Sequence, residues 1–153
     1  MELLILIYVI VIILAFLIRF SQIKKTKEKI KGLADNTLEI TPEEFFAIKK
    51  EKIGKKSIAN QYDFAGVYIL YNNTKNMYYV GQSVNVFKRV SNHLTGYGNG
   101  NVYADFKYGD DFTIKMIALE NSGFNTLNEL ERNTIMTYNA YSKGYNKTRG
   151  NKG

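Results

Sequence analysis

The stretch GVYILYNNTKNMYYVGQS, residues 66–83, decides the fold of this chain. Two apolar, aromatic-rich runs flank the polar turn NNTKN, and this pattern is typical of two antiparallel strands joined by a tight connection. The first run contains Gly66-Val67-Tyr68 and the second contains Tyr79-Val80-Gly81. A plain hairpin needs these tyrosines only for packing, which leaves open whether they also carry chemistry.

The residues after the hairpin predict further helices and one more strand. Residues 84–94 have helical spacing, and Arg89 and His93 share a face because they stand four apart. The glycine- and asparagine-rich run TGYGNGN, residues 95–101, predicts a loop. FTIKMIAL, residues 112–119, alternates with period two and predicts a third strand. Residues 126–129, TLNE, form a capping box that opens a helix to about residue 140.

Glu131 is the most informative residue of that last helix. Leu127, Ile135 and Tyr138 lie four before, four after and seven after it, which places Glu131 on the apolar stripe. A carboxylate on a buried stripe must be paired, protonated or bound to a cation. A salt bridge to a core-facing arginine such as Arg89 and a functional role both satisfy that requirement.

The residue inventory limits the chemistry that this domain can perform. The chain has no cysteine and one histidine, which excludes disulfides, thiolate metal sites and sites built from several histidines. It contains no recognisable serine or cysteine hydrolase motif. Phosphodiester hydrolysis instead needs an activated water, a cation for the nonbridging oxygens and stabilisation of the leaving oxygen. The candidate residues for these tasks are Tyr68, Tyr79, Arg89, His93, Glu131 and Asn146.

These residues, in this order, resemble the GIY-YIG nuclease family over residues 64–150. GVY (66–68) and YVG (79–81) match the two name motifs, and GYN (144–146) matches the closing motif. Arg89, His93 and Glu131 match the arginine, the histidine and the metal-binding glutamate of the family. Valine replaces isoleucine in both name motifs, and RGN stands where paired glycines are often found.

The resemblance implies a fold, a cofactor and a set of roles. The fold would be α/β, a small domain with a central three-stranded antiparallel sheet flanked by helices. The cofactor would be Mg²⁺ or Mn²⁺ on Glu131. Tyr68 would be the leading general base, with Tyr79 hydrogen-bonded in the site and Arg89 clamping the phosphate. His93 would orient a tyrosine or assist proton transfer, and Asn146 would support the site.

The N-terminal residues predict a membrane anchor. LLILIYVIVIILAFLI, residues 3–18, is apolar without interruption, and with Arg19 snorkelling the stretch 3–20 is long enough to span a bilayer. A cleavable signal peptide would need a basic start and a small-residue cleavage site, whereas Glu2 precedes this run. A buried core helix would not be apolar on every side. We therefore expect an uncleaved, single-pass anchor over residues 1–20.

The residues after the anchor predict its orientation. Lysines crowd just after the span, at 24, 25, 27, 29 and 31, and nothing basic precedes it, so the C-terminal domain should be cytoplasmic. The segment Lys24–Lys31 should contact anionic lipid, which accounts for part of the net charge of +7. Residues 21–63 then form a basic juxtamembrane segment and a connector. Its helix starts at the capping box TPEE, 41–44, runs to about Lys52, rests on the domain and breaks at Gly54–Ser57.

Together these features predict a metal-dependent DNA endonuclease in the cell membrane. The membrane anchor would be residues 1–20, the juxtamembrane segment and connector residues 21–63, and the nuclease domain residues 64–150. No separate DNA-recognition domain follows the nuclease-like region in this chain, so target choice would come from location, a homo-oligomer, a partner or DNA structure. Confinement at the membrane favours action on incoming phage or plasmid DNA, or in a mobile element. The alternative is a membrane-tethered DNA-binding or interaction module without catalytic activity.

Overall fold

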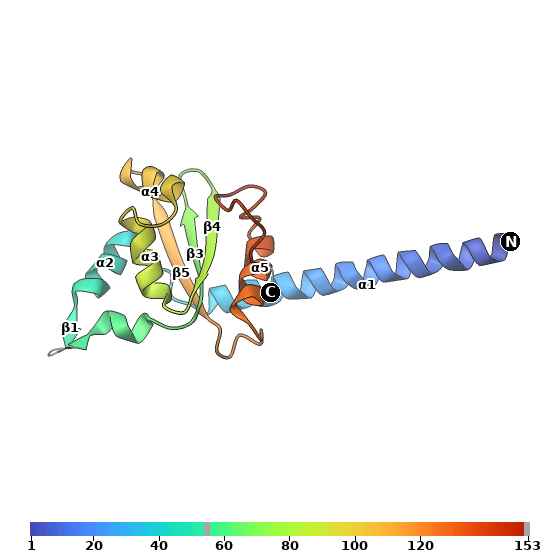
Figure 1. The fold of residues 1–153 in the computed structure, drawn as a ribbon, viewed down its shortest axis with the longest axis horizontal. Coiled ribbons are helices and arrows are strands. Elements are labelled where there is room, and N and C mark those ends of the chain that lie inside the picture. The colour runs from blue at the N-terminus through green and yellow to red at the C-terminus, as the bar shows by residue number, and fades with distance from the viewer. Residues whose placement is uncertain (54–55, 152–153) are drawn as a thin grey trace.

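A three-stranded antiparallel sheet forms the centre of the molecule (Figure 1). The computed structural model describes residues 1–53 and 56–151. The strands are β3 (Gly66–Asn72), β4 (Met77–Ser83) and β5 (Phe112–Ala118), in the order β4-β3-β5. In the β3–β4 turn, Asn76 adopts a φ of 52°, a left-handed conformation that asparagine tolerates. The three predicted strands are therefore confirmed, each within two residues of its predicted ends.

The two faces of this sheet bury different residues of the same strands. Because side chains alternate along a strand, Tyr68 and Leu70 pack on one side, while Val67 and Ile69 pack on the other. Helices α2 (Pro42–Lys50), α3 (Val86–Leu94) and α4 (Gly100–Lys107) cover the first face (Figure 1). Helix α5 (Leu127–Thr137) and the end of α1 (Glu2–Asp35) cover the second. The sheet thus separates two hydrophobic cores, which we call the α3-side core and the α1-side core.

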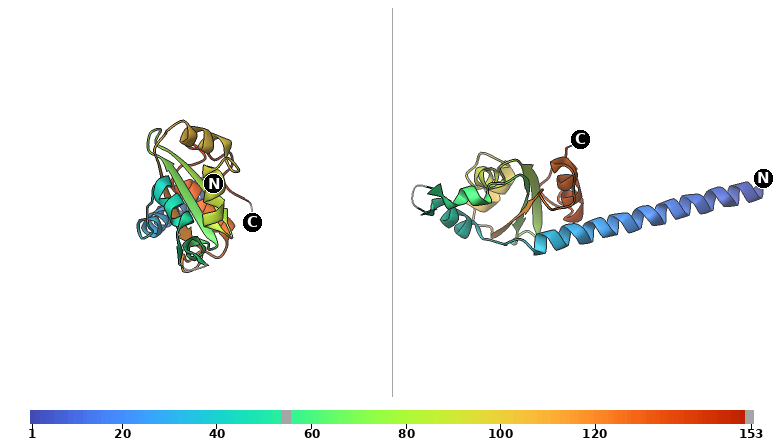
Figure 2. Two further views of the ribbon diagram at one scale, coloured as in Figure 1. Left: turned by 90° about the vertical axis from the view of Figure 1, so that its left-hand side faces the viewer. Right: turned by 90° about the horizontal axis from the view of Figure 1, so that it is seen from below.

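Helix α1 (Glu2–Asp35) is one uninterrupted helix that joins the apolar N-terminal run to the domain (Figures 1 and 2). By length and composition it could cross a membrane, and its most apolar window is fully exposed. Its other end is buried: Ile30 and Ala34 have no exposed surface and pack in the α1-side core against Leu130. Lys29 Nζ also donates a hydrogen bond to the Gly123 carbonyl at 2.8 Å. The last two turns of α1 are therefore part of the folded domain.

Helix α2 (Pro42–Lys50) is the predicted connector helix, and it rests on the domain as expected. The backbone N–H of Glu44 donates to Thr41 Oγ1 at 3.2 Å, and the Thr41 N–H donates back to Glu44 Oε2 at 2.8 Å. Phe45 is fully buried and stacks on Phe87 with ring centroids 4.2 Å apart. After α2 come β1 (Lys52–Ile53), β2 (Lys56–Ser57) and a 3-10 turn (Ile58–Tyr62). Of the break predicted at Gly54–Ser57, residues 54 and 55 lie outside the described residues.

The remaining helices agree with the sequence patterns except at one place. Helix α3 (Val86–Leu94) and helix α5 (Leu127–Thr137) lie where helices were predicted, although α5 ends about three residues early. Asn139, with a φ of 52°, follows α5 in the left-handed conformation that terminates many helices. Helix α4 (Gly100–Lys107) was not predicted and starts within the expected loop. Its N-cap is Asn99, whose side chain accepts hydrogen bonds from the N–H groups of residues 101 and 102.

Candidate active site

Strands β3 and β4 and helix α3 bring three of the predicted site residues into one aromatic cluster. Tyr68 pairs with Gly81 across the β3–β4 ladder, and Tyr79 lies on the same face of the sheet. The ring centroids of Tyr68 and Tyr79 are 6.1 Å apart, and the His93 ring lies 5.3 Å and 4.8 Å from them. Tyr68 is 1% exposed and Tyr79 is half-buried. The tyrosines of the two name motifs therefore share a site with the histidine of α3.

Gly81 and Gly66, the glycines of the two name motifs, are each required for a different steric reason. A Cβ on Gly81 would lie 2.1 Å from the Tyr68 hydroxyl oxygen, so only glycine lets that ring cross β4. A Cβ on Gly66 would lie 2.1 Å from the Ile117 carbonyl oxygen, so glycine allows β5 to approach. The first glycine is needed by the site and the second by the sheet.

The hydrogen bonds of His93 determine its tautomer. The backbone N–H of Asn99 donates to His93 Nδ1 at 2.8 Å, so Nδ1 carries a lone pair. Burial lowers the pKa of His93 to about 4, and the positive charge of Arg89 acts in the same direction, so the ring is neutral at pH 7. The proton of a neutral ring then lies on Nε2, which donates to the Tyr68 hydroxyl at 2.9 Å. His93 thus holds Tyr68 in place, and the phenol proton of Tyr68 points elsewhere.

Both tyrosines are protonated near neutral pH in this arrangement. Burial raises the pKa of Tyr68 above its ordinary value, and the neighbouring Tyr79 adds to this effect. The guanidinium of Arg89 opposes it, as expected, but does not overcome burial. Burial likewise raises the pKa of Tyr79, which Arg89 lowers and Glu131 raises. A tyrosine base in this site therefore requires additional positive charge to release its proton.

Glu131 reaches this neighbourhood from the other side of the sheet. It is 8% exposed on α5, which confirms its position on the buried stripe. Its Oε2 accepts hydrogen bonds from Gln82 Nε2 at 2.9 Å and from the Asn151 N–H at 3.3 Å. Among the described residues it has no ion-pair partner, so of the two alternatives that the sequence left open, the salt bridge to an arginine such as Arg89 is not present there. Its carboxylate is held by neutral donors alone.

The arrangement around Glu131 fits a divalent cation. Its Oε1 accepts no hydrogen bond from the residues that the structure describes, which leaves one carboxylate oxygen for a ligand role. Mg²⁺ is commonly bound through one or two carboxylates together with water and substrate phosphate. A cation here would also supply the positive charge that the tyrosines need.

Asn146 supports the site through the backbone of β4. Its Nδ2 donates to the Val80 carbonyl at 2.7 Å, and its Oδ1 accepts from the Val80 N–H at 2.9 Å. The Tyr145 N–H donates to the Tyr78 carbonyl at 2.9 Å, so the closing motif lies along the free edge of β4. Both polar atoms of the Asn146 amide are occupied, which makes it a positioning residue for Tyr79 and Gly81.

The sequence patterns did not identify two supporting residues, Gln82 and Asn99. Gln82 holds Glu131, and its Nε2 also donates to Asn128 Oδ1 at 2.6 Å. Asn99 donates its backbone N–H to His93 Nδ1. The loop can approach the ring this closely because residue 98 is glycine: a Cβ there would lie 2.5 Å from His93 Nδ1. Glycines clustered one turn after a candidate histidine were the available signal, since such loops allow close backbone approach.

The comparisons with known proteins bear directly on this site. The family described as the GIY-YIG catalytic domain matches residues 64–146, which are more than half of the chain. Neither the curated proteins nor the solved structures gave a match. The matched residues include both motif tyrosines, Arg89, His93, Glu131 and Asn146. The chain therefore belongs to the GIY-YIG family of nucleases.

Proposed function

We propose that this protein is a membrane-anchored, metal-dependent DNA endonuclease that hydrolyses phosphodiester bonds. The observation that carries the proposal is the convergence of Tyr68, Tyr79 and His93 with a buried carboxylate, Glu131, that has no cationic partner among the described residues. A buried carboxylate without a counter-charge is costly unless it has a ligand to bind. Asn146 holds the backbone of β4 between Tyr79 and Gly81, and the exposed side chain of Arg89 supplies a positive charge.

Each residue of the site has a distinct task in this proposal. The exposed guanidinium of Arg89 binds the nonbridging oxygens of the scissile phosphate, for which its planar, charged donors are suited. His93 keeps the Tyr68 hydroxyl in place through Nε2–H. A phenol then accepts a proton from the attacking water, and Tyr68 remains our leading choice, with Tyr79 hydrogen-bonded beside it. Glu131 would hold the Mg²⁺ or Mn²⁺ ion, which when bound supplies positive charge for the phosphate and the leaving oxygen.

A nicking assay on supercoiled plasmid tests the enzymatic part of the proposal. The full chain in detergent should nick the plasmid with Mg²⁺ and should not do so in EDTA. Glu131→Gln should reduce the rate by roughly a hundredfold or more, a loss on the scale of removing one essential electrostatic group. Glu120→Gln, a matched change at an exposed loop carboxylate, should leave the rate unchanged.

Two results would overturn the enzymatic proposal. Nicking at equal rates by wild type and Glu131→Gln would exclude the assigned site. Binding of the plasmid without cleavage in either Mg²⁺ or Mn²⁺ would instead favour the alternative, a membrane-tethered DNA-binding or interaction module.

The membrane part of the proposal concerns which DNA is cut. The exposed apolar half of α1 would lie in the cell membrane, and the lysines that follow it favour a cytoplasmic nuclease domain. Anchoring confines the site to the bilayer surface and raises its effective concentration there. This favours DNA that crosses the membrane, as in defence against phage or plasmids or in a mobile element.

Deletion of residues 3–20 tests whether confinement selects the target. The deletion retains Ile30 and Ala34, so the α1-side core stays intact. We expect the shortened protein to damage chromosomal DNA more and to reduce uptake of foreign plasmid or phage less than the full chain. Unchanged chromosomal damage and unchanged protection would show that the anchor does not select the substrate.

A further inference from the structure

The continuity of α1 sets the height of the domain above a bilayer. The apolar stretch ends at Phe20, and Ile23 and Thr26 are already half-buried against the domain. Three to six helical residues correspond to about 5–9 Å along the axis. The headgroup layer of one leaflet is about 5–8 Å thick. If α1 spans the membrane as proposed above, the face of the domain from which α1 emerges therefore lies among the headgroups.

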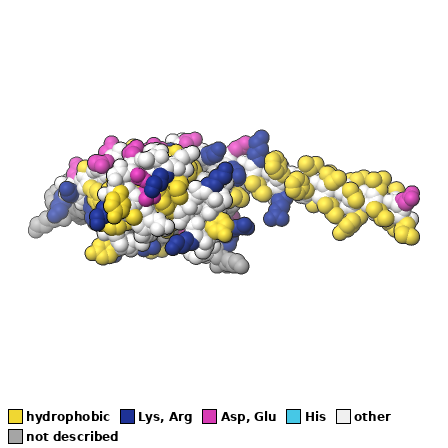
Figure 3. Space-filling view, turned by 90° about the horizontal axis from the view of Figure 1, so that it is seen from above, with side chains coloured by type: hydrophobic (Ala, Val, Ile, Leu, Met, Phe, Trp, Pro, Cys, Tyr) yellow, Lys and Arg dark blue, Asp and Glu magenta, His cyan; other side chains and the backbone are white. Residues whose placement is uncertain are grey.

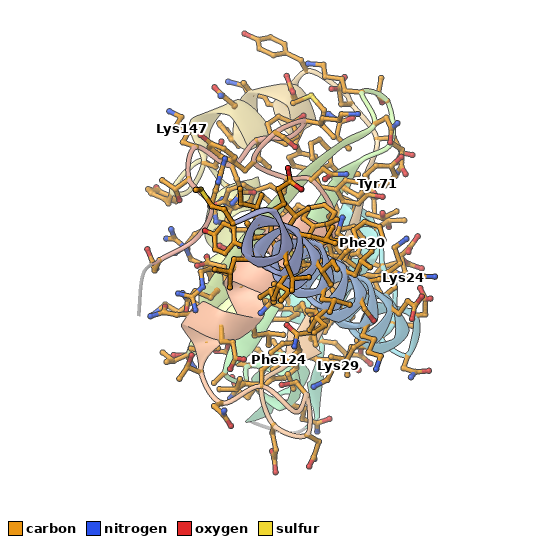
Figure 4. All side chains as sticks on the ribbon, turned by 90° about the vertical axis from the view of Figure 1, so that its right-hand side faces the viewer. Phe20, Lys24, Lys29, Tyr71, Phe124 and Lys147 are labelled. Atoms are coloured by element: carbon orange, nitrogen blue, oxygen red, sulfur yellow. The ribbon has the colours of Figure 1, made fainter. Side chains whose placement is uncertain are left out.

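Helix α5 forms that face. It lies on the side of the sheet from which α1 leaves the domain (Figure 1), and Figure 4, which views the molecule from this side, shows α5 behind α1. Leu130 and Ile135 of α5 are buried in the α1-side core. Arg132 is exposed and Met136 is only half-buried, so they lie on the opposite side of the helix, away from the sheet. This outer side of α5 faces the membrane.

A cationic cleft of about 430 Å³ lies between the outer side of α5 and the C-terminal tail. Two arginines line it: Arg132, and Arg149, whose guanidinium lies 5.3 Å from the ring centre of Tyr141. Asn133, Asn139 and Ser142 add neutral polar groups, and no carboxylate is among the lining residues. In residues 1–53 and 56–151 neither arginine makes an ion pair. Arg132 Nη1 donates to the Asn151 carbonyl at 3.3 Å, and the remaining guanidinium donors of the two arginines are suited to a phosphate group.

We propose that this cleft binds the phosphate groups of anionic membrane lipids. The proposal rests on the membrane anchoring described under the proposed function and adds a second attachment, made by the folded domain itself. Lys24 and Lys29 on α1 lie beside this face (Figure 4), and dark blue side chains are visible where α1 meets the domain (Figure 3). Held at two places, the domain keeps one orientation, with the tyrosine face of the sheet turned away from the bilayer.

Lipid is favoured over DNA as the occupant because of where the cleft opens. Tyr68, Tyr79 and His93 lie on the opposite side of the sheet, in the α3-side core and its margin. The part of the site that reaches α5 is Glu131, which is buried beside Gln82 of β4, whereas Arg132 is exposed on the outer side of the helix. The cleft therefore opens away from Glu131, on the side where α1 would bring a lipid headgroup.

The absence of cysteine makes a site-specific test direct. Single-cysteine versions of the full chain, S142C at the cleft and Y108C next to α4, are labelled with a fluorophore and reconstituted in nanodiscs. The nanodiscs contain either phosphatidylcholine alone or added phosphatidylglycerol, with a quencher on a fraction of the headgroups. We expect strong quenching at residue 142 that increases with phosphatidylglycerol, and weak quenching at residue 108 in both membranes.

Replacing single basic residues by alanine then identifies the side chains that bind the lipid. Arg132→Ala and Arg149→Ala should each lower the ratio of docked to undocked domains roughly fivefold, the effect expected for one basic residue at an anionic surface. Lys107→Ala, a matched change on α4, should leave quenching at residue 142 unchanged.

Three outcomes would overturn the proposal. The first is quenching at residue 142 no stronger than at residue 108. The second is a loss of plasmid nicking in the two arginine variants with unchanged quenching, which would assign the cleft to DNA. The third is access of a water-soluble quencher to a label at I12C, which would show that α1 is not inserted. That last result would remove the anchoring proposal as well, whereas the first two would leave it standing.

Discussion

The two faces of the central sheet differ in what they bury, although the same three strands build both. The α3-side core contains Tyr68 beside the buried His93, polar groups that are hydrogen-bonded to each other. The α1-side core is built from aliphatic side chains such as Val67 and Ile30, and it includes the end of the helix that we propose crosses the membrane. The α3-side face therefore holds the tyrosine–histidine cluster, and the α1-side face holds the attachment of the domain to α1.

The edge strand β4 connects these two faces. Tyr79 lies on the α3-side face, while Gln82 donates to Glu131, which comes from α5 on the α1-side face. Gly81, between them in sequence, leaves room for the Tyr68 hydroxyl. The candidate site is thus assembled across the sheet, and the packing of α1 and α5 determines where Glu131 lies relative to β4.

The largest effect on the rate of plasmid nicking is expected from Gly81→Ala. The new Cβ would lie 2.1 Å from the Tyr68 hydroxyl oxygen, so the ring or β4 must move. A displacement of about 1 Å in a catalytic group can cost about a hundredfold in rate. We expect a loss of nicking of that order, together with a lower melting temperature.

Gly100→Ala is the matched control for that variant. A Cβ on Gly100 has no neighbour within 4 Å, and its φ is not in the left-handed region. The variant should be fully active and as stable as the parent or slightly more so. Full activity of Gly81→Ala would show that Tyr68 does not need its present position.

The next largest effect, a loss of unfolding free energy, is expected from Ile30→Ala in the α1-side core. Ile30 is fully buried, and truncation of a buried isoleucine to alanine costs about 2–5 kcal/mol of unfolding free energy. Ile12→Ala, on the exposed apolar half of the same helix, should change the unfolding of the domain by less than about 0.5 kcal/mol. Denaturant unfolding of the full chain in detergent measures both values. Equal effects at the two positions would show that α1 does not belong to the core.

A smaller effect, on the pH dependence of stability, is expected from His93 beside the α3-side core. The pKa of His93 is lowered by burial, to about 4, from an unfolded value of 6.5. A group whose folded pKa is depressed contributes stability above its unfolded pKa, and this contribution is lost as the pH falls from 6.5 towards 4. The full contribution is on the order of 3 kcal/mol. Melting temperatures between pH 7 and pH 5 should fall less steeply for His93→Gln than for the parent, whatever the variant's absolute stability. Equal slopes would mean that folding does not lower the pKa of His93.

Much of the fold and of the candidate site could be predicted because the signals are local. The hairpin has turn residues between apolar runs, and Thr41 and Thr126 are N-caps with a glutamate three residues later. Glu131 was found because a charge on an apolar helical stripe is conspicuous. Tyr68 and Tyr79 followed from their glycines and their spacing.

The buried end of α1, helix α4 and the role of Gln82 were harder to predict. Ile30 and Ala34 are buried at helical spacing, but they stand among lysines that a juxtamembrane segment would also contain. Helix α4 begins in a glycine-rich run that favours a loop, and it forms because the Asn99 side chain caps it. Gln82 acts through one side-chain hydrogen bond to a residue distant in sequence, which residue type and local pattern do not encode.

A single-turnover cleavage in ¹⁸O-labelled water distinguishes attack by water from attack by a tyrosine. The full chain, in excess over a DNA substrate and with Mg²⁺, is allowed to cut once, and the new terminal phosphate is analysed by mass spectrometry. Attack by a water that a phenol activates predicts one ¹⁸O atom in that phosphate and no protein bound to DNA. A phosphate without ¹⁸O, or DNA joined covalently to Tyr68 or Tyr79, would show that a tyrosine attacks the phosphorus and would contradict the account.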